Sequence, residues 1–278
     1  MELLRARREQ ALIRLAIQGP SGSGKTFSSL LLAYGLVGDW NQIVVIDTEH
    51  NSSHLYSHLG QYDVLSLSKP FSPERFIEAI ETCEKAGKKV IIIDSISHEW
   101  SGEGGILDVH GNLPGNSFTN WAKITPRHNA FVQKMLQSPC HIIGNIRVKQ
   151  DYVLTEKNGK MVPEKVGLQG VTREDLGYEF TIMFDIDIKH NAVASKDRTN
   201  LFSDKPQFII SEATGELIRN WCQGGIKVSD IETEIENCQT IEGLRHILTK
   251  YQQHRNSLEP AIYRRKAQIE TLAAAVTT

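Results

Sequence analysis

Short apolar runs alternate with amphipathic stretches along most of the chain. The runs LIRLAIQ, QIVVID, KKVIIIDS and CHIIGNIR are largely apolar on both faces, which is typical of central strands in a parallel sheet. Between two of them, PERFIEAIETCEKAG predicts a helix, because Pro73 suits a first turn and apolar residues recur at helical spacing from Phe76 to Cys83. The pattern predicts an α/β fold with helices covering a mostly parallel sheet.

The pattern changes after Arg147. The polar segment 148–175, with its K-N-G-K turn, predicts a hairpin or a loop. The runs YEFTIMFDIDI and NAVAS then predict an antiparallel extension of the sheet, joined at residues 190–191. Residues 224–278 predict a small helical C-terminal segment, with Ser229 as a candidate cap, so we divide the chain into 1–223 and 224–278.

The Gly- and Asn-rich segment 101–117 predicts a long loop in front of a helix around Trp121–Leu136. The loop follows the predicted strand KKVIIIDS, so it would begin near the edge of the sheet where the parallel strands end.

Composition is that of an ordinary globular protein, with 278 residues, 40% hydrophobic and 23% charged. A net charge of −2 gives no general basic field, so any binding to nucleic acid must use a local patch. The four cysteines lack C-x-x-C spacing and are expected to be reduced. The chain has neither an apolar run of about 20 residues nor a signal-peptide pattern, so we expect a cytoplasmic protein without a membrane partner.

The strongest motif is GPSGSGKT, which matches G-x-x-x-x-G-K-[ST] and lies between an apolar strand and a helical pattern. Backbone N–H groups of such a loop and the following helix N-terminus hold phosphate groups. Lys25 is expected to reach the β- and γ-phosphates of ATP, and Thr26 to ligate Mg²⁺. The expected ATP-binding residues are Gly19, Pro20, Ser21, Gly22, Ser23, Gly24, Lys25, Thr26 and Phe27.

A P-loop also needs an acidic residue at the end of a neighbouring strand to orient Mg²⁺, and KKVIIIDS supplies Asp94. Hydrolysis further needs a carboxylate that positions the attacking water. In many AAA+ ATPases a glutamate directly follows the aspartate, but Ser95 stands there in this chain. Glu49, just past QIVVID, is therefore the predicted base, with Asp47 and Glu99 as the alternatives.

The order GPSGSGKT, IDTE, IIIDS and a late K-x-R resembles RecA-like P-loop ATPases, a group that includes recombinases and hexameric helicases. More closely, VIDTEHNSS, DSISHEWSGEGG, IRVKQDY and SKDRT resemble phage-encoded RecA-like AAA family ATPases associated with single-strand annealing and recombination. The resemblance covers roughly Leu12–Trp221 and leaves the helical tail unexplained.

This resemblance implies an oligomer, as a ring or a filament, that hydrolyses ATP with Mg²⁺ and binds single-stranded DNA. It implies that Lys196 and Arg198 reach the γ-phosphate held by the next subunit, as arginine-finger cations. It also implies a γ-phosphate sensor at Asn145, or alternatively at Arg147. The tail is a candidate site for a replication or recombination protein, and a nucleotide-gated adaptor without DNA-stimulated hydrolysis is the alternative function.

Loops that grip DNA in RecA-like proteins correspond to residues 98–120 and 148–175. The first carries Trp100 and Phe118 but almost no positive charge. The second balances its basic and acidic residues, so the charge support for DNA binding is local. Its basic residues are Lys149, Lys157, Lys160, Lys165 and Arg173, and its aromatic residue is Tyr152.

Three histidines, His50, His54 and His58, recur at intervals of four and would share one face of a helix. No H-E-x-x-H pattern accompanies them, so we interpret this face as a polar surface rather than a metal site.

Overall fold

The computed structural model describes the backbone of residues 11–157, 160–223, 228–251 and 255–276. Within these ranges, the side chains of 150–168, 228–230, 256 and 272–276 are not described. The chain divides into two compact units, a core of Arg8–Cys222 and a C-terminal unit that begins at Gln223.

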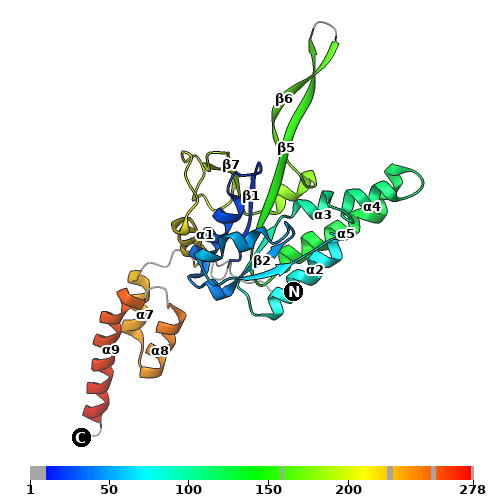
Figure 1. Ribbon diagram of the computed structural model, residues 1–278. Coiled ribbons are helices and arrows are strands. Elements are labelled where there is room, and N and C mark those ends of the chain that lie inside the picture. The colour runs from blue at the N-terminus through cyan, green and yellow to red at the C-terminus, as the bar shows by residue number, and fades with distance from the viewer. Residues whose placement is uncertain (1–10, 158–159, 224–227, 252–254, 277–278) are drawn as a thin grey trace. The chain divides into compact units, whose positions relative to one another are not determined.

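The core is built on one mixed sheet whose main path runs in the order β3-β2-β4-β5-β1-β7-β8, while β6 pairs with β5 (Figure 1). Neighbours from β3 to β7 are parallel, and β8 is antiparallel to β7. The strands are β1 (Arg14–Gly19), β2 (Ile43–Asp47), β3 (Asp63–Ser66), β4 (Val90–Asp94), β5 (His141–Lys157), β6 (Lys160–Gly170), β7 (Ile182–Ile186) and β8 (Ala192–Asp197). The predicted parallel sheet with an antiparallel extension is confirmed.

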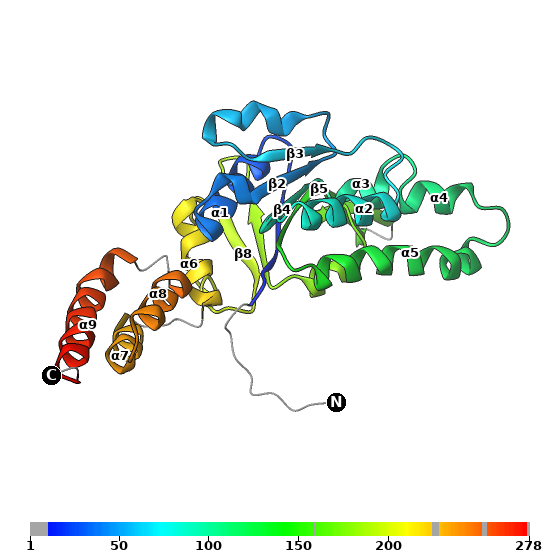
Figure 2. The same ribbon diagram turned by 90° about the horizontal axis from the view of Figure 1, so that it is seen from below.

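Helices cover both faces of this sheet (Figure 2). The α-helices of the core are α1 (Lys25–Val37), α2 (Pro73–Lys85), α3 (Ser97–Ser101), α4 (Ile106–Asn112), α5 (Ser117–Gln137) and α6 (Glu212–Cys222); 3₁₀ turns are η1 (Trp40–Gln42), η2 (Ser52–Leu59) and η3 (Glu174–Glu179). Alternate residues of β4 divide between two cores, with Ile92 on the side of α1 and α6, and Ile91 and Ile93 on the side of α2 and α5. Such burial on both faces explains why the central strands are continuously apolar.

Two sequence expectations need correction. The predicted long loop at 101–117 contains α4 instead, and α5 begins earlier than Trp121, because Asn116 caps it by accepting from the backbone N–H of Phe118 at 2.8 Å. Ser229 falls at the start of the first C-terminal helix, beside residues 224–227, and its side chain lies outside the described part of the chain, so its role as a cap stays a prediction.

The polar segment after Arg147 forms a hairpin, as predicted. Up to Arg147, β5 pairs with β1 and β4 inside the sheet; from Val148 onward its pairing is with β6. The same strand therefore runs from the sheet centre into the hairpin.

A buried arginine ties β1 to the end of α5. The guanidinium of Arg14 donates to the carbonyl oxygens of Leu136, Ser138 and Cys140 at 2.9, 2.6 and 2.8 Å. These carbonyls belong to the last turn of α5 and the residues just after it, where helix carbonyls lack an intrahelical donor. Burial lowers the pKa of Arg14, and the contact fixes the strand that leads into the P-loop.

The C-terminal unit contains α7 (Val228–Asn237), α8 (Ile241–Lys250) and α9 (Arg255–Val276), which agrees with the predicted helical character. Their apolar side chains form a separate core around Ile231, Ile247 and Leu258. Among the described residues of the whole chain, no helix combines the length and the apolar character needed to cross a bilayer.

Candidate functional site

The predicted P-loop connects β1 to α1, as the sequence implied. Gly22 and Gly24 have φ angles of 79° and 87°, which explains the glycines at these positions. Lys25 folds back over the loop, and its Nζ donates to the carbonyl oxygens of Gly19 and Pro20 at 2.8 and 2.9 Å. Burial lowers the pKa of Lys25, an effect opposed by the nearby carboxylates Asp94 and Glu49.

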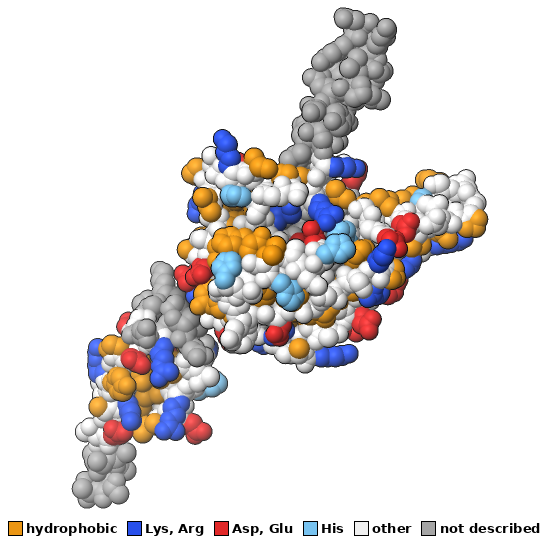
Figure 3. Space-filling model, viewed as in Figure 1, with side chains coloured by type: hydrophobic (Ala, Val, Ile, Leu, Met, Phe, Trp, Pro, Cys, Tyr) orange, Lys and Arg blue, Asp and Glu red, His pale blue; other side chains and the backbone are white. Residues whose placement is uncertain are grey.

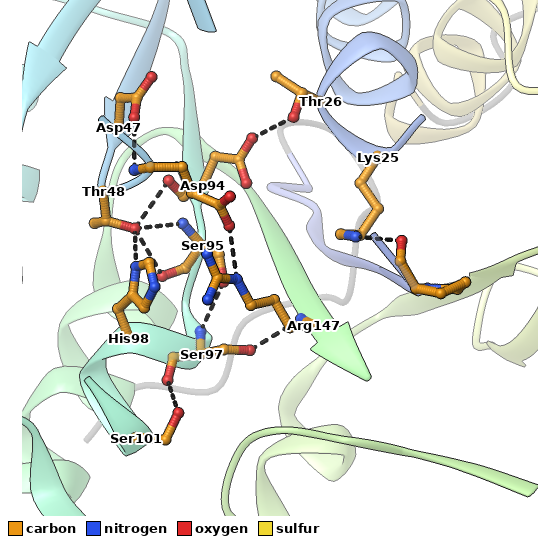
Figure 4. A network of polar contacts seen from close by, with 12 residues as sticks. Lys25, Thr26, Asp47, Thr48, Asp94, Ser95, Ser97, His98, Ser101 and Arg147 are labelled. Carbon is orange, nitrogen blue, oxygen red and sulfur yellow. Dashed lines mark hydrogen bonds and ion pairs between the residues drawn. The ribbon is translucent and has the colours of Figure 1, made fainter. Parts of the chain in front are cut away.

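Thr26 and Asp94, the two predicted Mg²⁺ ligands, meet at the end of the sheet. Thr26 Oγ1 donates to Asp94 Oδ2 at 2.5 Å (Figure 4). Burial raises the pKa of Asp94 to about 6; the hydrogen bond from Thr26 opposes the rise, and the charge of Glu49 adds to it. One hydroxyl and one carboxylate beside a phosphate cradle suit Mg²⁺, which usually takes few protein ligands and completes its shell with water and phosphate oxygens.

The end of β2 is fixed against the end of β4. Thr48 Oγ1 accepts from the Ser95 N–H at 2.7 Å and lies 2.6 Å from His98 Nδ1 (Figure 4). Asp47 is buried and accepts from the backbone N–H groups of Glu49 and Ser53 at 2.7 and 2.8 Å. Asp47 therefore organises the turn, and its carboxylate oxygens are already occupied by turn donors.

Glu49 lines the same cavity as Lys25, Thr26 and Asp94. Its Oε1 is paired with Arg147 Nε at 2.9 Å, and both side chains are partly exposed. Glu49 thus has access to the cavity, which the role of a water-positioning base requires, while its carboxylate is held by a cation.

The third candidate base, Glu99, has a different environment. It is fully buried, and both of its carboxylate oxygens lie 3.1 Å from His128 Nδ1. Glu99 is not among the residues that line the nucleotide cavity, so the geometry favours Glu49 over Glu99.

Asn145 is opposite Asp94 in the pairing of β4 with β5 and is fully buried. Its Oδ1 accepts from Ser29 Oγ at 2.7 Å, whereas its Nδ2 has no hydrogen-bond partner among the described residues. The amide nevertheless lies close enough to Asp94 to lower the pKa of that carboxyl. Asn145 is not among the residues that line the nucleotide cavity, so its amide contacts Ser29 and Asp94 rather than the cavity itself.

The cavity around these residues has a volume of about 790 Å³, enough for a nucleotide. Phe27 and Tyr56 lie on its apolar part, with ring centroids 5.9 Å apart, and Ile209 and Ile210 also line it. No local motif predicts Tyr56, His190, Ile209 or Ile210 as lining residues, because they lie far apart in the chain. The apolar rings and aliphatic side chains provide surface against which a base can pack.

Lys196 and Arg198 lie side by side at the end of β8. Lys196 Nζ donates to the carbonyl oxygens of Gly177 and Tyr178 at 2.8 and 2.6 Å, and an Arg198 amino group donates to Tyr178 at 2.9 Å. Burial lowers the pKa of Lys196, and the charge of Arg198 lowers it further. Neither side chain lines the chain's own nucleotide cavity.

A second cavity of about 1020 Å³ lies between α3–α5 and the base of the β5–β6 hairpin. We call it the aromatic groove; one wall carries Trp100, Leu107, Phe118 and Trp121, and the other carries Lys149 and the stretch Gln169–Asp175. Trp100 and Trp121 stack at 5.9 Å, and Phe118 is 85% exposed. The groove brings together parts of the two predicted DNA loops; the side chains of Tyr152, Lys157, Lys160 and Lys165 lie outside the described part.

Positive charge in and around the groove is modest. Arg173 pairs with Asp175 at 3.2 Å, so Lys149 is the groove cation without an acidic partner among the described residues. On the face shown in Figure 3, Lys and Arg side chains are scattered rather than gathered into one patch.

The histidine row does not form the predicted helical face. His54 and His58 lie on the 3₁₀ turn η2, whereas His50 precedes it with a φ of 56°. Among the described residues, no cluster of three or more His, Cys, Asp or Glu side chains has the arrangement of a metal site.

A glycine-rich strand–loop–helix cradle, a hydroxyl of the first turn of α1 bonded to the carboxylate that ends β4, and a second carboxylate facing the same cavity together define a P-loop ATPase-type domain. A comparison with protein-family models agrees: the family described as "AAA domain" matches residues 11–209, and the chain belongs to this family. No curated protein matches the sequence.

Proposed function

We propose that the chain is an oligomeric, Mg²⁺-dependent ATPase that binds single-stranded DNA during phage-type recombination or strand annealing. The observation that carries the enzymatic part is the convergence of Lys25, Thr26, Asp94 and Glu49 on one cavity. Lys25 would leave the loop carbonyls for the phosphates, and Thr26 with Asp94 would hold Mg²⁺. Bound Mg²⁺ supplies charge that stabilises the transferring phosphoryl group.

Glu49 is proposed to orient the attacking water. Its Oε1 is paired with Arg147, which leaves Oε2 to accept from that water, and release of Arg147 would free both oxygens. Arg147 also lines the cavity, so a γ-phosphate offers it a new anionic partner as Glu49 is released.

Lys196 and Arg198 are proposed to act on the nucleotide of a neighbouring subunit. Their present partners are neutral carbonyl oxygens, and a phosphate would be a stronger acceptor for both cations. Since the pair lies away from its own cavity, a role in catalysis requires a second copy of the chain.

The aromatic groove is the proposed DNA site. Stacked indole rings and the exposed Phe118 offer planar surfaces on which unpaired bases can stack, and Lys149 can contact a phosphate. The C-terminal unit, with Tyr263 exposed on α9, is the proposed contact for a replication or recombination protein.

The alternative is a nucleotide-gated adaptor with slow hydrolysis that DNA does not stimulate. The Glu49–Arg147 ion pair and the small positive charge of the groove favour it. ATP turnover measured at low salt, with and without single-stranded DNA and across protein concentrations, separates the two functions. We expect turnover to rise with both DNA and protein concentration; a flat response to DNA would favour the adaptor.

A mixing experiment tests the shared site. Lys25→Ala and Arg198→Ala subunits are each expected to be inactive alone. Together they should regain part of the turnover, because some interfaces then combine an intact P-loop with an intact Arg198. Co-assembly without any recovery would contradict the role in trans.

A further inference from the structure

The turn between β7 and β8 packs directly against the P-loop. A Cβ atom added to Gly19 would lie 2.5 Å from the carbonyl oxygen of Ile186, and one added to Gly24 would lie 3.0 Å from His190 Nδ1. Two P-loop glycines are thus needed for contact with this turn, in addition to any contact with phosphate.

The turn is rigidly organised by Asp187. Its carboxylate accepts from the backbone N–H groups of Lys189 and Asn191 at 2.8 and 2.9 Å and from the Asn191 side chain at 3.1 Å. These hydrogen bonds, that of the Asn191 side chain first, lower the pKa of Asp187. His190 has a φ of 68°, and its N–H donates to the Asp187 carbonyl at 3.0 Å.

His190 holds one peptide unit of the P-loop. Its Nδ1 lies 2.9 Å from the carbonyl oxygen of Ser23, and since a carbonyl only accepts, Nδ1 carries the proton. In a trans peptide, the carbonyl and the following N–H point in opposite directions. The contact at Ser23 therefore directs the Gly24 N–H away from His190, and Gly24 lines the nucleotide cavity.

This contact differs from the others that hold the loop carbonyls. Gly19 and Pro20 are held by Lys25, which the proposed mechanism moves onto the phosphates. The bond from His190 to Ser23 involves no group that the ligand is expected to recruit. It can therefore keep the loop in its phosphate-binding shape both before and after the nucleotide arrives.

We propose that His190 is a positioning residue of the nucleotide site, which holds the Ser23–Gly24 peptide with its N–H toward the phosphates of a nucleoside di- or triphosphate. The assignment rests on the proposed nucleotide binding and extends the site to a turn far outside the P-loop motif. It predicts that the affinities for ADP and for ATP depend on His190 to a similar degree, because both nucleotides bind to the same conformation of the loop.

Three substitutions at His190 test this assignment by calorimetric titration of the full chain with Mg²⁺·ADP and Mg²⁺·ATP. His190→Gly keeps the backbone conformation but removes the donor, and it should weaken both Kd values roughly fivefold to tenfold. His190→Asn places an amide donor near the position of Nδ1 and tolerates positive φ, so its Kd should stay within about twofold of the original. His190→Gln places its amide donor beyond that position, so its Kd values should be as weak as those of the glycine variant.

Thermal unfolding without nucleotide accompanies each titration and separates positioning from folding. A positioning role predicts that the asparagine variant regains affinity and that kcat at saturating ATP changes less than KM. Equal Kd values for the glycine variant and the unaltered chain would overturn the assignment, as would an asparagine variant that folds but binds as weakly as glycine. If the unaltered chain bound neither nucleotide, the proposed function itself would fail.

Discussion

The phosphate cradle and the aromatic groove are two cavities of the same core, but they are built in different ways. The cradle is one continuous segment, Gly19–Thr26, whose backbone conformation depends on the positive φ angles of Gly22 and Gly24. The groove combines side chains from the short helices α3 and α4 and from the long helix α5 with a wall from the β5–β6 hairpin and the residues after it. Its two walls are joined in sequence only through α5 and β5.

The two cavities also differ in how their charged side chains are paired. In the cradle, charged groups already have partners that a nucleotide and Mg²⁺ can replace, such as the Thr26–Asp94 bond. In the groove, one of the two cations is neutralised by its neighbour Asp175. The cradle is therefore specialised for a compact anion, whereas the groove offers mainly stacking surface.

The largest effect is expected from Lys25→Ala. Removing the ammonium group leaves the β- and γ-phosphates without their main side-chain cation, so kcat/KM should fall roughly a thousandfold. ATP turnover and nucleotide titration measure the loss. Lys205→Ala removes an exposed lysine outside the cavity and serves as the matched control. If both variants hydrolysed ATP equally well, the cradle would not be the catalytic site.

Glu49→Gln should separate binding from chemistry within the cradle. The amide keeps the shape of the side chain but cannot accept the proton, so kcat should fall about a hundredfold while ATP still binds. Single-turnover hydrolysis and ATP titration give the two quantities. Glu103→Gln changes a carboxylate that is exposed and paired with Lys69, and it should leave both unchanged. If the Glu49 variant retained its turnover, another residue would have to be the catalytic base.

The sequence predicted the cradle well because its chemistry is local. The glycines, Lys25 and Thr26 are neighbours in the chain, and Asp94 and Glu49 follow apolar strands whose ends meet in a parallel sheet. The groove and the contact of His190 with Ser23 were not predictable in this way, because they depend on which distant turns and helices pack together. The helix α4 is hidden in the sequence because the glycines and asparagines of the segment 101–117 around it are typical of a loop.

The ion pair between Glu49 and Arg147 lay equally outside the sequence argument. The sequence predicts separate roles for them, a base and an alternative sensor; they meet because β5 pairs with β4, which in turn pairs with β2. Whether Glu49 is free or held depends on that long-range contact rather than on its motif.

Trp121→Ala should affect the groove and leave the cradle unchanged. Trp121 stacks on both Trp100 and His110, so its loss removes the central planar surface of the groove. The Kd for single-stranded DNA, measured by fluorescence anisotropy, should rise about tenfold, with no change in the Kd for ATP. Trp121→Phe retains a ring and should recover much of the affinity. A rise in both Kd values would mean that the two cavities are not separate sites.

The smallest expected effect concerns the stability of the cradle itself. Asp94 is buried with a pKa of about 6, so without Mg²⁺ the folded protein favours the protonated carboxyl more than the unfolded chain does. Stability from this group is present at low pH and is lost as pH rises through about 6. Asp94→Asn removes the buried charge and should raise Tm by roughly 3 °C at pH 7.5, measured without nucleotide or Mg²⁺.

At about pH 3.5 the same substitution should leave Tm almost unchanged, because Asp94 is then mostly protonated in both the folded and the unfolded chain; at pH 5 roughly half of the gain in Tm should remain. Addition of Mg²⁺·ATP at pH 7.5 should stabilise the original chain more than the asparagine variant, since the ion compensates the carboxylate charge. A variant that was less stable at both pH values would show that the Thr26–Asp94 contact contributes more to folding than the buried charge costs. In that case the aspartate would be a structural link between α1 and β4 as well as a metal ligand, and the cradle would resemble the groove in depending on long-range packing.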